Sequence, residues 1–158
     1  MKTMKGLLFC LSTALIFAAS VEANPTIKIK QDIFAAIDSI DYISLNILLA
    51  EGANIDKTDQ NGNTPLMVAA KVGNHRILDI ILSHNPNINK HNKGGKTALI
   101  IAAETGQLSV VEKLLAHNAE TSIKDQNNNT ALTLASKFGH KKIVDLIKDM
   151  RTQPTLAK

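Results

Sequence analysis

One short pattern recurs along this chain at a fixed interval of 33 residues. Thr64, Thr97 and Thr130 each open a similar stretch of sequence. Without insertion or deletion, the same interval relates two further series: Ala69, Ala102 and Ala135, and Gly73, Gly106 and Gly139. Periods of about 20 to 50 residues are typical of proteins built from stacked, similar units. The chain is therefore predicted to be a repeat array, in which each unit buries its apolar side against its neighbours.

Each unit has the signals of two short helices. Thr64 is a good helix N-cap, and Pro65 suits the first helical position because its missing N–H would have no intrahelical partner. Small alanines follow, and Gly73 can take the left-handed conformation that ends a helix. A second helix is indicated by apolar residues at i, i+1, i+4 and i+5, which mark one buried side: Ile77, Leu78, Ile81 and Leu82, then Val110, Val111, Leu114 and Leu115. The pattern predicts an all-α fold.

The units are joined by polar loops with a tight turn. Gly62, Gly95 and Asn128 occupy one position of the repeat. Glycine and asparagine are the residues that best tolerate positive φ, so a tight turn explains this position.

The three stretches TPLMVAAKVGN, TALIIAAETGQ and TALTLASKFGH are similar to the TPLHLAAxxGH pattern of the ankyrin-repeat family, and EGANID resembles its GADVN loop. The resemblance implies a solenoid of stacked helix-turn-helix units with short β-hairpin-like loops, and a function in protein–protein interaction without catalysis. The histidine of that pattern is replaced by Met67, Ile100 and Thr133, so the family's Thr–His hydrogen bond cannot form.

The repeat sets the expected domain boundaries. An ankyrin-repeat domain is predicted over residues 24–150, followed by a flexible tail at 151–158. Within it lie a degenerate N-terminal repeat (31–60), two repeats (61–93 and 94–126) and a C-terminal capping repeat (127–150). In the first of these, Ile40 stands where the other units have glycine.

Residues 1–23 have the features of a cleavable secretory signal. Lys2 and Lys5 precede the apolar run 7–19, and Val21-Glu22-Ala23 supplies small residues for cleavage after Ala23. The apolar run is shorter than the roughly 20 residues that span a bilayer. We expect export to the periplasm or the exterior, with no integral membrane segment after signal removal.

The remaining residues offer no catalytic motif and predict no cofactor or metal. Gly94-Gly95-Lys96-Thr97 resembles the end of a phosphate-binding loop, but Lys90 stands where that motif needs its first glycine. His84 and His117 lie one repeat apart without an obvious carboxylate companion, and helix-end solvation explains them better than a metal site. The net charge of +4 is spread along the chain, which disfavours a nucleic-acid partner.

The family resemblance implies that loop tips and first helices line a concave binding face. We therefore expect a monomer whose partner is another protein, with a polar and acidic surface. Phe138 is either an exposed contact residue or packed beneath the last helix. Metal handling and membrane-surface association are the alternative functions. The candidate partner-binding residues are Gln60, Asn61, Asn63, Lys71, Val72, Lys93, Gly94, Lys96, Glu104, Thr105, Gln126, Asn127, Asn129, Lys137 and Phe138.

Overall fold

The computed structural model of the chain describes residues 32–152. The predicted signal with its cleavage site at Ala23, the segment 24–31 and residues 153–158 lie outside the described residues. Within them, no helix is long and apolar enough to cross a membrane.

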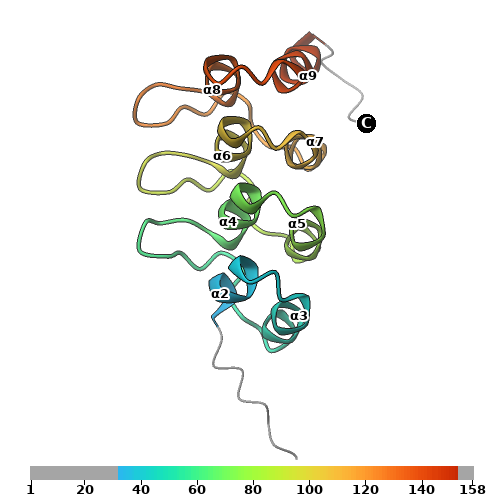
Figure 1. Cartoon of the computed structure of the whole chain (residues 1–158). Coiled ribbons are helices and arrows are strands. Elements are labelled where there is room, and N and C mark those ends of the chain that lie inside the picture. The colour runs from blue at the N-terminus through green and yellow to red at the C-terminus, as the bar shows by residue number, and fades with distance from the viewer. Residues whose placement is uncertain (1–31, 153–158) are drawn as a thin grey trace, which may run out of the picture. The chain divides into compact units, whose positions relative to one another are not determined.

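The described residues form four helix pairs. The first helices of the pairs are α2 (Ile33–Asp38), α4 (Pro65–Val72), α6 (Ala98–Thr105) and α8 (Ala131–Lys137). The second helices are α3 (Tyr42–Ala50), α5 (His75–Leu82), α7 (Leu108–Ala116) and α9 (Lys141–Thr152). Figure 1 shows each kind stacked in its own row, with three loops projecting from the row of first helices. The predicted all-α repeat fold is confirmed, although α9 continues past the expected boundary at 150.

The predicted threonine caps begin the first helices of three units. Thr64, Thr97 and Thr130 each accept a hydrogen bond, 3.3 Å long, from the backbone N–H three residues on. Other atoms replace the missing histidine in two units, because Met67 Sδ accepts from the Thr64 N–H at 3.4 Å and Thr133 Oγ1 accepts from the Thr130 N–H at 2.8 Å. Ile100 has no polar side-chain atom, so its unit keeps only the first of the two bonds.

The core lies between the two rows of helices and is aliphatic. One position of the first helices carries a completely buried alanine in every unit, namely Ala36, Ala69, Ala102 and Ala135, which allows close approach, while the second helices contribute larger side chains. Each internal unit is covered on both sides, since α6 packs against both α4 and α8. Most of the stability of such an array comes from contacts between neighbouring units.

The last unit is polar at positions that the internal units bury. The positions of the buried residues Met67, Ala70 and Leu82 are occupied in the last unit by exposed Thr133, Ser136 and Lys148. No described unit follows to cover these positions, so polar side chains there are solvated at little cost. The expected capping role of the last unit thus rests on specific substitutions.

The first unit carries a strained residue at its helix–helix turn. Ile40 has φ +56°, at the position where Gly73, Gly106 and Gly139 have φ of +75° to +77°. Positive φ is costly for a β-branched residue. The repeat geometry is therefore retained in this unit although its sequence departs from the pattern.

Candidate functional site

The three projecting loops are built on one repeated side-chain turn. Asp59, Asn92 and Asp125 lie one repeat apart, and the Oδ1 atom of each accepts hydrogen bonds from the backbone N–H groups two and four residues on. These bonds are 2.7–2.9 Å long. Backbone bonds across the same residues close each loop as a hairpin. Sequence reasoning did not assign this role, although the 33-residue spacing of Asp, Asn and Asp was a visible signal.

Each loop is also bonded to the next. The Lys93 N–H donates to the Asn61 carbonyl at 3.1 Å, and the Gln126 N–H donates to the Gly94 carbonyl at 3.0 Å. Asn92 Nδ2 donates to Asn63 Oδ1 at 2.8 Å. The loop tips therefore form one continuous row.

Close approach of the loops, and not only backbone conformation, explains the glycines at their tips. Gly62, Gly95 and Asn128 all have positive φ, as predicted. A Cβ on Gly62 or Gly95 would lie 3.0 or 2.9 Å from a backbone nitrogen of the following loop. Asn128 is in the last loop that the structure describes, where no following loop restricts the side chain.

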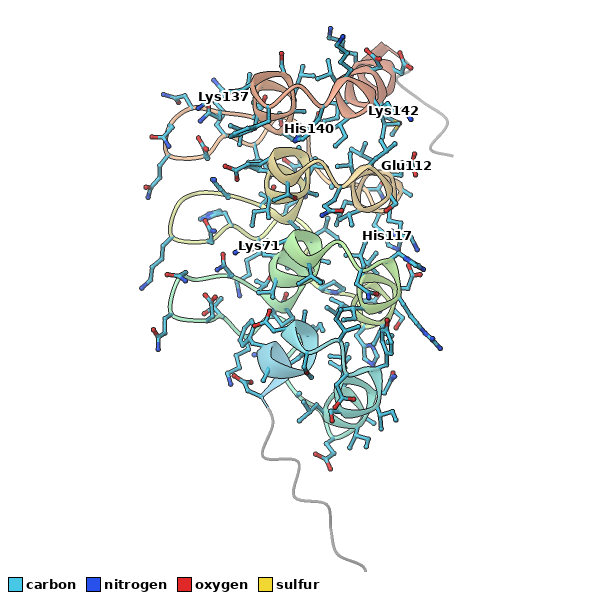
Figure 2. The ribbon with its side chains drawn as sticks, viewed as in Figure 1. Lys71, Glu112, His117, Lys137, His140 and Lys142 are labelled. Carbon is cyan, nitrogen blue, oxygen red and sulfur yellow. The ribbon has the colours of Figure 1, made fainter. Side chains whose placement is uncertain are left out.

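An ion pair places the loop tips and the ends of the first helices on the same side of the array. Lys96, in the middle loop, contacts Glu104 near the end of α6, with 2.6 Å between Nζ and Oε2. Lys71 and Lys137 also lie toward the first helices, whereas Glu112, His117 and Lys142 lie toward the second helices (Figure 2). The predicted candidates thus share one side of the molecule.

The candidates divide into exposed and half-buried residues. The exposed ones form the surface that we call the tip face: Gln60, Asn61, Lys71, Lys93, Thr105, Gln126, Asn127, Lys137 and Phe138. The half-buried ones are Asn63, Val72, Gly94, Lys96, Glu104 and Asn129. Asn63 and Asn129 donate to the carboxylates of Asp59 and Asp125, so both hold the loops in shape.

Phe138 is exposed at the end of α8. Half of its surface, 50%, is accessible, and its ring centroid lies 6.4 Å from that of His140. Lys137 Nζ lies 5.7 Å from the same centroid. Of the two interpretations of Phe138, the structure favours the exposed residue over packing beneath the last helix.

The loop carboxylates are more acidic than ordinary aspartates. Burial tends to raise the pKa of Asp125, but hydrogen bonds from Asn129 and Asn127, together with the charge of Lys96, outweigh it and lower that pKa. Asp59 also has a lowered pKa, since bonds from Asn63 and Asn61 outweigh the effect of burial. Both loops are therefore most stable with the aspartate ionised.

This shift predicts an acid-dependent effect of Asp125→Asn. A lowered folded-state pKa contributes stability that is fully present above the unfolded-state pKa and is lost as pH falls through the folded-state value. We expect Asp125→Asn to lower the free energy of unfolding at pH 7, and the difference from the unaltered chain to shrink as pH falls below about 4 and to be lost below the folded-state pKa. Urea unfolding followed by circular dichroism across pH would measure it, and a difference that stays constant with pH would contradict the expectation.

Histidines contact backbone carbonyls at helix ends. The Nδ1 atoms of His84 and His117 lie 2.9 and 2.8 Å from the carbonyl oxygens of Ile80 and Lys113, one turn earlier. His140 Nε2 lies 3.1 Å from the Glu104 carbonyl of the preceding unit. Among residues 32–152, no three His, Cys, Asp or Glu side chains are grouped closely enough to hold a metal ion.

The comparison with known families agrees with this geometry. A model described as "Ankyrin repeats (3 copies)" matches residues 33–125 and 95–156 of the chain. No curated protein matches the sequence.

Proposed function

Because the chain belongs to the ankyrin-repeat family, we propose that it binds a partner protein through the tip face. Ankyrin repeats are in general protein–protein interaction modules without catalytic activity. The observation that supports this face is a hydrogen-bonded loop scaffold that carries exposed side chains. Gln126 Nε2 belongs to the scaffold, since it donates to the Lys93 carbonyl at 2.6 Å, whereas the side chains of Asn61, Lys93 and Asn127 are exposed and take no part in it. Such a surface can vary in sequence without loss of the fold.

The charges of the tip face suggest the chemistry of the partner. Lys71, Lys93 and Lys137 are exposed and form no ion pair within the described part of the chain, whereas Glu104 is paired with Lys96. Around them lie side-chain amides and the half-exposed ring of Phe138. The proposed partner surface is acidic, rich in hydrogen-bonding groups, and able to cover one aromatic ring, since exposed aromatics are common binding hot spots.

Export is also part of the proposal, and its support is the sequence pattern of residues 1–23 alone. A partner would then be met in the periplasm or outside the cell. We do not extend the proposal to metal handling, because His84 and His117 contact carbonyls of their own helices.

Removal of two exposed charges from the tip face tests the proposal. We expect Lys71→Gln with Lys93→Gln to weaken partner binding about tenfold at low salt, because complementary charges steer association and discriminate partners. Affinity capture from the compartment in which the chain is found, followed by titration of the captured protein, would measure this. Lys96 and Asn129 stay unaltered because both support the scaffold.

The matched control removes two exposed lysines from a second helix. Lys141→Gln with Lys142→Gln changes the net charge by the same amount on α9, away from the tip face. This control variant should bind the partner with the same affinity as the unaltered chain. Equal losses in the two variants would mean that binding follows net charge, and retention by both would exclude the tip face.

A further inference from the structure

The outer side of α3 exposes apolar residues. Ile43 and Ile47 are one helical turn apart, and 75% and 37% of their surfaces are accessible. Among the described residues, Ile43 has the largest exposed fraction of any large apolar side chain in the structure. We call the side of α3 that carries these two residues the α3 face.

The repeat itself does not require isoleucine at position 43. The equivalent positions in the later units carry Arg76, Ser109 and Lys142, all exposed. Stacking therefore works with polar residues at this position. An exposed apolar side chain there calls for an explanation other than the fold.

Contacts of the equivalent residues show which way the α3 face points. The Arg76 guanidinium lies over the Tyr42 ring of the preceding unit, 4.9 Å from its centroid. Lys113, equivalent to Ile47, forms an ion pair with Asp79 of the preceding unit. These positions face backwards along the array, so Ile43 and Ile47 point to the end where no preceding unit is described. Figure 1 shows α3 at that end of its row, beside α5.

Acidic residues lie at both ends of α3. Between residues 32 and 56 the chain has Asp and Glu residues but no Lys or Arg. The Asp41 side chain accepts from the N–H groups of Ile43 and Ser44 at the start of α3. Exposed Glu51 follows α3 and lies four residues after Ile47, which extends the row of Ile43 and Ile47.

A second copy of this chain complements the α3 face poorly. Two α3 faces would place like charges against each other. At the opposite end of the array, polar Thr133, Ser136 and Lys148 replace residues that the internal units bury, and the exposed Met150 of α9 is a single apolar side chain against the pair Ile43 and Ile47. The complementary partner has an apolar stripe flanked by basic residues.

We propose that the α3 face binds a basic amphipathic helix of another protein. The helix would pack beside α3, with its apolar stripe over Ile43 and Ile47 and its basic residues near Asp41 and Glu51. Rows of side chains four residues apart on α3 suit such helix packing. This surface is separate from the tip face and does not depend on the function proposed there.

Synthetic helical peptides test the proposal with the full chain. The probe is a peptide of roughly 18 residues, made of Leu and Lys with Leu at helical spacing, and a second peptide has Glu in place of Lys. Isothermal titration calorimetry should show binding of the Lys peptide and none of the Glu peptide. We expect Ile43→Ser with Ile47→Gln to weaken binding at least about tenfold, because burial of a largely exposed isoleucine is lost.

Further variants distinguish the apolar from the electrostatic contribution to peptide binding. Asp41→Asn, which keeps a side-chain oxygen to cap α3, with Glu51→Gln should weaken binding several-fold and reduce its dependence on salt, as expected for charge attraction at an exposed surface. As a control, Met150→Gln removes a half-exposed apolar side chain of α9 and should leave binding unchanged. Far-UV circular dichroism would confirm that each variant is folded.

Three outcomes would overturn the proposal. Equal affinity for the Lys and Glu peptides would show that charge complementarity is absent, and equal weakening by the control variant would show that the peptide has no preference for α3. Self-association of the unaltered chain that Ile43→Ser with Ile47→Gln abolishes, measured by sedimentation, would assign the α3 face to a second copy.

Discussion

Replacement of Leu99 by Ala should lower the free energy of unfolding by about 3 kcal/mol, because truncation of a buried leucine loses its transfer free energy and leaves a cavity. Leu99 is 1% exposed and lies on α6, which packs against the first helices of both neighbouring units. Since neighbouring units stabilise each other, a cavity in the third of the four units weakens contacts on both sides. The unfolding transition should also become less cooperative.

The repeat supplies the control for this experiment. Leu132 is the equivalent residue of the last unit and is only half-buried. Leu132→Ala should lower the free energy of unfolding by about 1 kcal/mol, because less surface is lost from the core and solvent can fill the space. Urea unfolding followed by circular dichroism suits the comparison, since the chain has no Trp. Equal losses of unfolding free energy at the two positions would contradict the expectation that Leu99, between two neighbouring units, contributes more to stability than Leu132.

Replacement of Gly95 by Ala should lower the free energy of unfolding by about 3 kcal/mol, through backbone strain and a lost hydrogen bond. Gly95 has φ +75°, and its added Cβ would lie 2.9 Å from the backbone nitrogen of Gln126 and 3.1 Å from the Cα of Asp125. These are backbone atoms, so the two loops must separate. The bond from the Gln126 N–H to the Gly94 carbonyl should break.

The variant Gly139→Ala distinguishes the effect of positive φ from the effect of a close contact with another loop. Gly139 has φ +77°, but a Cβ there meets nothing within 4 Å. Gly139→Ala should lower the free energy of unfolding by about 1 kcal/mol, because alanine is strained at positive φ. Hydrogen exchange gives a second measurement, because the Gln126 amide should exchange faster in Gly95→Ala and remain protected in Gly139→Ala. If the two variants are equally stable, loop contact has no part in the choice of glycine at position 95.

The two ends of the described array differ in the surfaces that they present. At the last unit, polar residues replace the buried ones, which prevents further stacking. At the first described unit, an exposed isoleucine replaces the polar residue of the other units. The same repeat therefore ends in a solvated surface on one side and in an apolar, acid-flanked surface on the other.

The sequence by itself determined the fold, because its period was strict. Thr64 with its equivalents predicted the helix starts, and Gly73 with its equivalents predicted the left-handed turns. These features depend on residues close together in the chain, where capping and backbone conformation are local effects. The family assignment followed from the same residues, and the family comparison confirmed it.

Only the tertiary structure decided what the variable positions do, because their contacts are with neighbouring units. Asn61 and Asn63 are two asparagines of one loop, yet the Asn63 side chain bonds to Asp59 and to Asn92 of the next loop, while Asn61 is exposed. The exposure of Ile43 and of Phe138 likewise depends on which units lie beside them. Local sequence cannot predict such differences, since burial and hydrogen bonding are set by residues a whole repeat away.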